Sequence, residues 1–445
     1  MRSNTLALRT VALSFLLAVA SAAEPAPLSL PIRRIARRNL PQDDSRYYRN
    51  RYSAVDYVTI LEGTPTSSGS AVDSVPLLND LELYELAVNV SVGTPEQTFL
   101  LLFDTGSADT WIPSLNCQKG NGCLSGNQFD PSKSSTYHST NYPLSITYGT
   151  GSAHGDYFVD TVKVGNMTLD KQIVAMVDSN QGPIASQNTT DEGGDEFVMD
   201  GIFGAGYPGG TIMSQSYNQT YYPFPMALWQ EKKIPEPIFS VYIGESETSD
   251  WCGEIVFGGI NQSKLAGDLV YTDVVLYESP STGLPSHRRW TVWMQGFQLR
   301  NVNFKFAGQG SPFAVDTGSN FMYLPRNLAQ QMAQVIDPNV QIVDDQFVVD
   351  CKYLEDKSDI KLVFPASNTA ENPQGFQSVY TSIPISNIVG RREEDGKCLL
   401  FFVPSERFII GNMILRNLVT VYDFGNHRIG FAPAALPDDT NPASV

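Results

Sequence analysis

The sequence predicts a mainly β protein made of two related lobes. Strand-like stretches recur along its 445 residues, separated into short elements by 35 Gly and 28 Pro residues. The turn Asp-Thr-Gly-Ser occurs twice, at 104–107 and 316–319. Each copy is followed, at similar spacing, by an apolar run into glycine, GIFGAG and then FIIGNM. Two elements that recur in the same order indicate a duplicated fold with pseudo-twofold symmetry.

The first strands show two different burial patterns. Val88, Val90 and Val92 alternate with polar or small residues, which predicts a half-buried strand. Phe99–Phe103 is continuously apolar, as expected for a strand that is covered on both faces. Helical signals are few, and the clearest covers Leu328–Ile336.

The two acidic turns match over ten positions. Asp104 aligns with Asp316, and an aromatic residue, an aliphatic residue and a proline follow at the same distances in both copies. The middle of the turn differs, with Ala108-Asp109 in the first copy and Asn320-Phe321 in the second. The shared polar residues are Thr105, Gly106 and Ser107 in the first copy, and Thr317, Gly318 and Ser319 in the second.

A pseudo-twofold axis would bring Asp104 and Asp316 together at the junction of the lobes. Two carboxylates in contact do not both ionise easily, so they share one proton. The ionised carboxylate can then deprotonate a water molecule while the protonated one donates to the carbonyl under attack. This arrangement hydrolyses an amide without a metal or a covalent intermediate. One such turn alone would be better explained as an Asp that caps a turn; two matched copies favour the catalytic interpretation.

Residues 144–162 predict a β-hairpin with a glycine-rich tip. Leu144, Ile146 and Tyr148 alternate up to Gly149-Thr150-Gly151, and a second strand-like stretch follows. Tyr148 near the tip is placed to close over a cleft and exclude water. An ordinary surface hairpin explains the same pattern if the acidic turns are ignored.

The charge balance limits the partners. The net charge is −17, which argues against nucleic acid because phosphate binding needs a basic surface. The four histidines are scattered without metal-ligand spacing, so we expect no metal ion and no other cofactor.

The N-terminal segment predicts export. Arg2 and Arg9, an apolar stretch at 11–20 and small residues at 20–23 are typical of a signal peptide over residues 1–22. The polar C-terminal residues LPDDTNPASV predict no membrane anchor. Five N-x-S/T sequons fit export as candidate glycosylation sites, at Asn89, Asn166, Asn188, Asn218 and Asn261.

Five cysteines in an exported chain predict two disulfides and one unpaired residue. Cys117 and Cys123 enclose a short loop, and Cys351 with Cys398 is the natural second pair. Cys252 is then unpaired. We expect it to be a small, buried apolar residue rather than a reactive thiol.

The chain resembles the pepsin-like aspartic endopeptidases, and the secreted fungal members are the most similar. The resemblance covers nearly all of residues 76–433 and is carried by FDTGSADTWIPS, ITYGTGS, MDGIFGAG, AVDTGS and the closing FIIGNMILRNLVTVYDFGNHRIGFAP. It implies a bilobal acid protease fold of two β-barrel-like lobes with an active-site cleft between them. The implied domains are an N-terminal catalytic lobe at 76–262, which carries the flap hairpin, and a C-terminal catalytic lobe at 263–445.

The resemblance also implies roles for single residues. Asp104 and Asp316 match the catalytic pair, supported by the Thr, Gly and Ser residues of both turns. Tyr148 matches the flap tyrosine, with Trp111 as its hydrogen-bond partner. The positions that match substrate contacts are Tyr148, Gly149, Thr150, Ile202 and Asn320, and both proposed disulfides match family disulfides.

Residues 23–75 match an inhibitory propeptide. Residues 24–75 contain seven Arg and six acidic residues, so they are basic relative to the rest of the chain. In the family a basic propeptide side chain pairs with the aspartates, and Arg46, Arg49 and Arg51 are the candidates here. A flexible arm with processing sites at its Arg-Arg pairs explains the composition equally well.

The resemblance implies a monomeric zymogen that cleaves polypeptides in acid, preferring large hydrophobic residues around the scissile bond. Free secretion is expected, with delivery to a vacuole as the lesser possibility. Two other function classes share part of this pattern. Actin-like ATPases also duplicate a strand–Asp–Gly turn, but the signal peptide and the shortage of basic residues disfavour that class. An inactive member of the protease fold would usually lack an Asp or the flap tyrosine, and all three are present.

Overall fold

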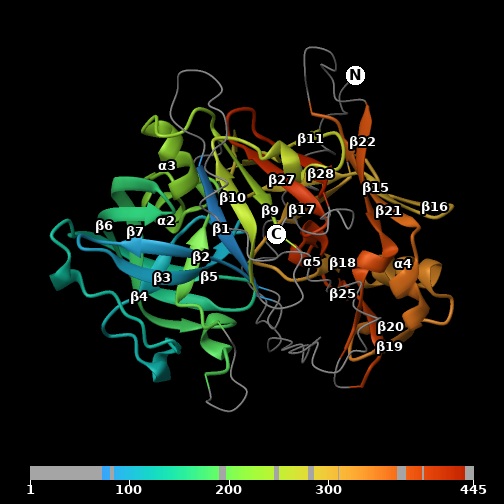
Figure 1. Ribbon diagram of the computed structural model, residues 1–445, viewed down its shortest axis with the longest axis horizontal. Helices are drawn as coiled ribbons and strands as arrows, with labels where there is room; N and C mark the ends of the chain where they lie inside the picture. Colours follow the sequence, from blue (N-terminus) through green and yellow to red (C-terminus); the bar gives the residue numbers. More distant parts are fainter. Residues whose placement is uncertain are drawn as a thin grey trace, which may run out of the picture. The chain divides into compact units, whose positions relative to one another are not determined.

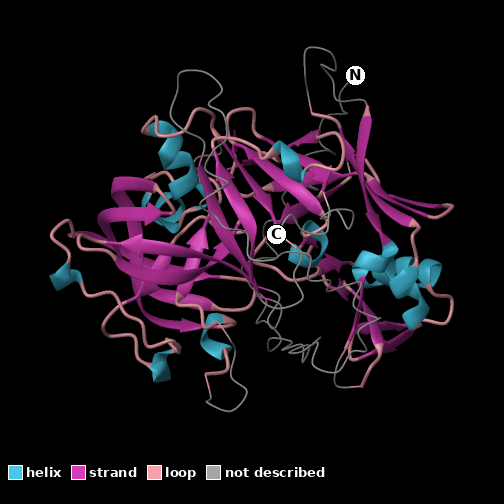
Figure 2. Cartoon of the chain, in the orientation of Figure 1, coloured by secondary structure: helices cyan, strands magenta, loops and turns pink. Residues whose placement is uncertain are grey.

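The computed structural model describes residues 73–80, 85–189, 197–244, 250–278, 285–308, 310–367, 377–392 and 395–435. The predicted signal peptide and nearly all of the predicted propeptide lie outside these residues. Strands dominate the described chain and helices are short, as Figure 2 shows. The predicted mainly β fold is therefore confirmed.

One large sheet contains thirteen of the described strands. Their order is β11 (Val270–Asp273), β28 (Arg428–Pro433), β27 (Leu418–Asp423), β9 (Ile238–Tyr242), β10 (Asp250–Phe257), β1 (Asp73–Asp80), β2 (Glu85–Val92), β3 (Gln97–Asp104), β8 (Gly201–Gly204), β4 (Trp111–Pro113), β7 (Met167–Gln181), β6 (Ser152–Val164) and β5 (His138–Thr147).

The C-terminal half forms further sheets. One has the order β14 (Thr291–Met294), β17 (Ser311–Val315), β26 (Ile409–Ile410), β18 (Met322–Leu324) and β25 (Phe402–Pro404). A second has the order β16 (Val302–Lys305), β15 (Gly296–Leu299), β21 (Asp359–Pro365) and β22 (Ser378–Pro384). A third has the order β19 (Gln341–Val343), β20 (Gln346–Val349), β24 (Cys398–Leu400) and β23 (Val389–Arg391), and β12 (Tyr277–Glu278) pairs with β13 (Pro285–Ser286). The described residues form the α-helices α2 (Ile212–Tyr217), α3 (Phe224–Gln230), α4 (Arg326–Ile336) and α5 (Asn412–Leu415).

The two strands predicted at the start of the fold are present as β2 and β3. Val88, Val90 and Val92 are buried whereas Asn89 is exposed, so the alternation in the sequence places one face of β2 in the core. β3 pairs with it in antiparallel fashion and is buried from Leu101 to its end. The continuous apolar run therefore leads into the interior, where the first acidic turn begins.

The internal repeat is a repeat of topology. β3 runs parallel to β8 and places Asp104 opposite Gly204, while β4 pairs antiparallel with β8. In the second half β17 runs parallel to β26 and places Val315 opposite Ile410, while β18 pairs antiparallel with β26. Each acidic turn therefore connects two strands that lie on either side of a third strand. That third strand ends at Gly204 in the first half and directly before Gly411 in the second.

The two halves of the sequence share the large sheet. β27 pairs with β9 through Val421 and Ser240, and Figure 1 shows β9, β10, β27 and β28 side by side. The rings of Phe239 and Tyr422 stack across this pairing with centroids 4.6 Å apart. Val75, at the proposed propeptide boundary, lies within β1 and pairs with Ile255. The proposed domains 76–262 and 263–445 thus both contribute strands to one sheet.

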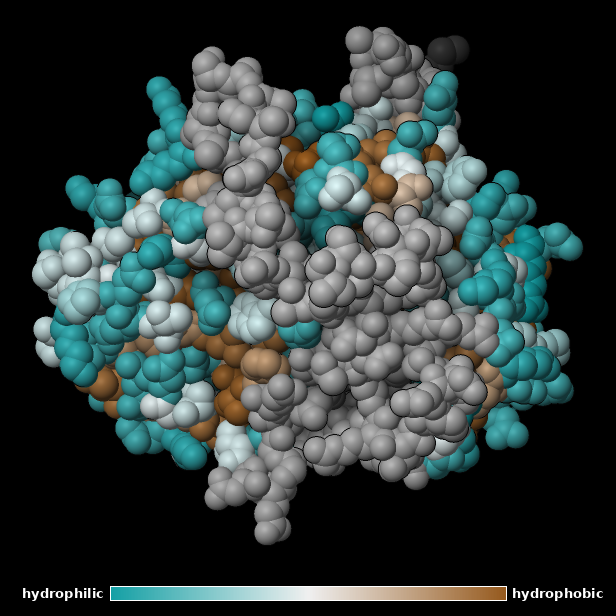
Figure 3. Space-filling model, in the orientation of Figure 1, coloured by the Kyte–Doolittle hydropathy of each residue, from teal (hydrophilic) through white to brown (hydrophobic). Residues whose placement is uncertain are grey.

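Helix α4 covers the predicted helical segment and begins two residues earlier, after Pro325. Ala329, Met332, Ala333 and Ile336 are buried, which is the spacing of an apolar stripe on one helical face. Hydrophilic residues cover the surface of this region, at the right-hand edge of Figure 3.

Both predicted disulfides are present, Cys117–Cys123 and Cys351–Cys398, and Cys252 is free and half-buried. Burial and the charge of Asp250 raise the pKa of Cys252 to about 12, so its thiol stays protonated at neutral and acidic pH.

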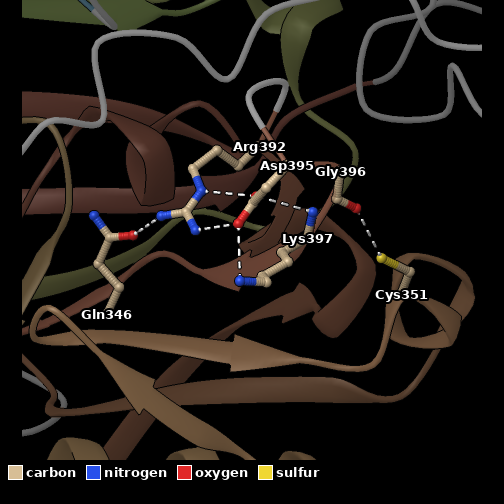
Figure 4. A network of polar contacts seen from close by, with 6 residues as sticks. All are labelled: Gln346, Cys351, Arg392, Asp395, Gly396 and Lys397. Atoms are coloured by element: carbon tan, nitrogen blue, oxygen red, sulfur yellow. Dashed lines mark hydrogen bonds and ion pairs between the residues drawn. The ribbon is translucent and has the colours of Figure 1, made fainter.

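A polar network lies beside Cys351, one of the two residues of the Cys351–Cys398 bridge (Figure 4). The guanidinium of Arg392 donates to both carboxylate oxygens of Asp395, at 3.0 and 2.6 Å, and to Gln346 Oε1 at 2.9 Å. Lys397 Nζ forms a further ion pair with Asp395 at 3.0 Å. The turn that leads into Cys398 is therefore fixed by charge as well as by the bridge.

The two bridges are expected to differ in their effect on stability. Cys351 and Cys398 are 47 residues apart, whereas Cys117 and Cys123 are 6 apart. A longer loop loses more chain entropy when it is closed. Replacing Cys351 and Cys398 by alanine is therefore expected to lower the free energy of unfolding by about 4 kcal/mol, and replacing Cys117 and Cys123 by about 2 kcal/mol. Urea unfolding measures both values. Cys252→Ala is the control, and equal losses for the two bridges would contradict the prediction.

Candidate functional site

The two acidic turns continue from strands of the same kind. Asp104 is the last residue of β3, and Asp316 directly follows β17. The backbone fixes both positions, since Ala205 N donates to Asp104 O at 2.8 Å and Asp316 N donates to Ile410 O at 3.0 Å. Gly106 and Gly318 follow the two aspartates by two residues, and neither has a left-handed backbone, so what they contribute is the absence of a side chain.

Each carboxylate is held by its own turn in the same way. Gly106 N donates to Asp104 Oδ1 at 2.7 Å, and Ser107 Oγ donates to Asp104 Oδ2. In the second turn Gly318 N donates to Asp316 Oδ1 at 2.9 Å, and Ser319 Oγ donates to Asp316 Oδ2 at 2.7 Å. Two donors per carboxylate fix its orientation before any ligand is bound.

The threonines join the two turns to each other. Thr105 N donates to Thr317 Oγ1, and Thr317 N donates to Thr105 Oγ1, both at 3.0 Å. The hydroxyl of Thr105 donates to Val315 O at 2.9 Å, and that of Thr317 donates to Phe103 O at 2.7 Å. Both threonines are buried. Each turn is therefore fixed by the strand of the other half.

The carboxylates lie against the opposite glycines. A Cβ atom placed on Gly106 would lie 2.5 Å from Asp316 Cγ, and one placed on Gly318 would lie 2.6 Å from Asp104 Oδ1. Only a residue without a side chain fits at either position. The glycines thus allow Asp104 and Asp316 to face each other closely enough to interact directly.

The two aspartates are not equivalent. Asp104 is 6% exposed, whereas Asp316 is half-buried. Burial, and then the charge of Asp316, raise the pKa of Asp104 to about 7, although the hydrogen bond from Ser107 opposes the shift. At acidic pH the pair therefore holds a shared proton.

The predicted hairpin is formed by β5 and β6, with Tyr148 N donating to Gly151 O at 2.7 Å across its tip. Trp111 Nε1 donates to Tyr148 Oη at 2.8 Å, as expected. Burial and the charge of Asp104 raise the pKa of Tyr148, so the phenol stays neutral. Ile202, 6% exposed, belongs to the same apolar cluster as Trp111. The hairpin tip is thus tied to the strand that follows the first acidic turn.

The remaining predicted contact residues lie around this tip and the second turn. Gly149 and Thr150 are exposed at the end of the hairpin. Asn320 is half-buried, and its carbonyl accepts a hydrogen bond from Met413 N at 2.8 Å. Among the described residues, no three His, Cys, Asp or Glu side chains are arranged to hold a metal ion.

One residue that the sequence did not single out supports the first turn. Asp109 is fully buried, and its carboxylate accepts hydrogen bonds from Tyr157 Oη at 2.6 Å, Tyr221 Oη at 2.7 Å and Ile212 N at 2.8 Å. Burial raises its pKa. The only signal in the sequence was that Asp109 breaks the repeat, because Phe321 occupies the corresponding position.

The sequons differ in accessibility. Asn89, Asn166 and Asn218 are exposed, while Asn188 and Asn261 are half-buried. Asn261 Nδ2 donates to Glu254 Oε1 at 2.8 Å, so the amide that would carry a glycan already has a partner. Glycosylation stays a prediction at all five.

The burial of Asp104 predicts a pH dependence of stability. Its pKa rises from 3.8 to about 7 on folding, so between these values the folded protein binds more protons at this group than the unfolded chain. The free energy of unfolding should therefore fall as the pH rises through this window. In Asp104→Asn the free energy of unfolding, measured by urea unfolding at pH 4, 5, 6 and 7, should depend less steeply on pH. Asp170→Asn, which alters an exposed carboxylate, is the control. A variant slope identical to that of the native sequence would contradict the prediction.

Comparisons with known proteins agree with this geometry. The family model for eukaryotic aspartyl proteases matches residues 85–434. Mucorpepsin of Rhizomucor miehei is 36% identical over 92% of this chain and 90% of its own, and mucorpepsin of Rhizomucor pusillus is 38% identical over 84% of each. The crystal structure of an aspartic proteinase from Irpex lacteus has the same fold, with a TM-score of 0.63 at 23% identity over 84% of this chain and 100% of that one. The chain belongs to the eukaryotic aspartyl protease family.

Proposed function

We propose that this chain is an aspartic-type endopeptidase that hydrolyses polypeptides at acidic pH. The observation that carries the proposal is the close pair Asp104 and Asp316, each carboxylate held by two donors of its own turn and facing the glycine of the other turn. Such a pair can hold a water molecule between one protonated and one ionised carboxyl group.

The proposed reaction uses the shared proton. Asp104 carries it at acidic pH, because burial disfavours its ionised form. The proposed base is Asp316, which takes a proton from the water; the water oxygen attacks the carbonyl carbon while Asp104 donates its proton to the carbonyl oxygen. Asp316 then donates the proton that it took from the water to the amide nitrogen, the C–N bond breaks, and Asp104 takes a proton from a hydroxyl group of the collapsing tetrahedral intermediate. The cycle ends with the pair again sharing one proton.

Substrate recognition is assigned to the hairpin and to the apolar residues below it. Tyr148 lies over the first turn and is anchored by Trp111, which keeps the tip close to Asp104. Ile202 and its apolar neighbours supply the surface that favours large hydrophobic side chains beside the scissile bond. Backbone groups of Gly149 and Thr150 are the proposed contacts with the peptide strand.

We further propose synthesis as a secreted, glycosylated, monomeric zymogen, with vacuolar delivery as the lesser possibility. Residues 1–22 would direct export, and 23–75 would inhibit the body until acid weakens their attraction to its carboxylates. Both mucorpepsin relatives align over most of the chain. Within the described part of the chain, no helix combines the length and apolar character that a membrane crossing needs.

The proposed chemistry is tested by digestion of a denatured protein substrate at acidic pH, with and without pepstatin. Asp104→Asn and Asp316→Asn should each lower kcat/KM by at least about a thousandfold, because neither leaves a carboxyl pair that can share a proton. Acid treatment should shorten the native chain but not the Asp104→Asn variant. Asp170→Asn, which alters an exposed carboxylate, should retain activity.

Activity that survives in the Asp104→Asn variant, or that pepstatin leaves untouched, would overturn the endopeptidase assignment. Continued inhibition of the acid-treated chain without any shortening would overturn only the proposed role of the propeptide.

The contact between the hairpin and the body predicts non-additive kinetics. Tyr148→Phe and Trp111→Phe both remove the same hydrogen bond, so each should lower kcat/KM by up to about tenfold. The double variant should lower kcat/KM by little more than the more impaired of the two single variants. Tyr142→Phe, on the outer part of the hairpin, is the matched control. Fully additive effects would mean that the hydrogen bond does not position the tip.

A further inference from the structure

A charged residue of the C-terminal half reaches the hairpin tip. Arg407 lies between β25 and β26, and its side chain is exposed. A Cβ atom placed on Gly149 would lie 2.0 Å from Arg407 Nη1 and 3.3 Å from its Cζ. The guanidinium therefore packs directly on the backbone of Gly149, at a place where this residue has no side chain.

The hairpin tip is thus contacted from both halves of the molecule. Trp111 holds Tyr148 from the first half, and Arg407 contacts Gly149 from the second. Tyr323 is the counterpart of Trp111 in the repeat. Burial and the charge of Asp316 raise the pKa of Tyr323 to about 12, while the charge of Arg407 opposes this shift. Arg407 therefore lies within electrostatic reach of the same phenol as the second aspartate.

A guanidinium in this position has a clear chemical preference. It remains charged throughout the acidic range and binds carboxylates through two parallel hydrogen bonds. The chain carries 30 basic and 47 acidic residues, so its average surface repels acidic peptides. A cation next to the hairpin tip would reverse that repulsion locally.

We propose that Arg407 is a specificity-determining residue that selects polypeptide substrates with Asp or Glu at the position bound beside Gly149. The proposal rests on the endopeptidase function proposed above. It adds a preference for an acidic substrate residue to the expected preference for large hydrophobic residues. The selected substrate is a peptide whose large apolar residues flank the scissile bond and which carries one carboxylate within reach of Arg407.

The test uses the acid-treated full chain and a mixed peptide library at about pH 5, where glutamate is mostly ionised. Cleavage-site profiles of the native sequence, Arg407→Gln and Arg407→Lys are compared. At the position with the strongest acidic preference, a matched Glu and Gln peptide pair is then used to measure kcat/KM. Arg326→Gln is the control, because Arg326 is an exposed arginine on α4 that pairs with Asp345.

The native chain should prefer the Glu peptide by about fivefold, the value of one ion pair of about 1 kcal/mol. The preference should vanish in Arg407→Gln, remain in part in Arg407→Lys and stay unchanged in Arg326→Gln. Because the ratio compares two peptides on one enzyme, a general effect of the variant on the aspartate pair cancels. Equal profiles for the native chain and Arg407→Gln would overturn the role of Arg407, whereas failure to cleave any peptide would instead overturn the proposed function.

Discussion

The reciprocal hydrogen bonds between Thr105 and Thr317 are the constraint on which the site depends. Neither half contains a complete carboxyl pair, so the two turns must be held in register by contacts that cross between the halves. Both threonine hydroxyls also donate to the opposite strand, at Val315 and Phe103. Buried hydrogen bonds of this kind are costly to leave unmade, so the turns cannot separate without exposing several unsatisfied groups.

That rigidity permits an unfavourable arrangement. Two carboxyl groups lie together in a largely buried place, and the energy of folding elsewhere must compensate for this. Glycines at positions 106 and 318 avoid a steric clash with the opposite aspartate. The hydroxyls of Ser107 and Ser319 donate hydrogen bonds to the carboxylates and so fix their orientation. Electrostatic repulsion between Asp104 and Asp316 remains, and sharing a proton relieves it. An acidic environment is thus favourable both for the proposed chemistry and for the folded site.

The sequence predicted the repeat, the first strands, helix α4, the hairpin and both disulfides, because these depend on local patterns or on short motifs. Burial of Val88 and Val90 follows from alternation, whereas the parallel pairing of β3 with β8 was not predicted, because it depends on which strands meet in the tertiary fold. Asp109 was not predicted, since its partners Tyr157 and Tyr221 are distant in sequence and tyrosines carry no motif. The contact of Arg407 with Gly149 likewise depends on tertiary placement.

The sheet shared by the two halves has a consequence for how the chain is made. β9 of the first half pairs with β27, which ends at Asp423, and β27 pairs in turn with β28, which ends at Pro433. A ribosome that has synthesised only the first half has therefore supplied β10, one neighbour of β9, but not yet β27, the other. The first acidic turn likewise acquires its partner threonine only when the second turn has been translated. The site can therefore assemble only late in synthesis, because a chain translated only through its first half contains Asp104 but not Asp316.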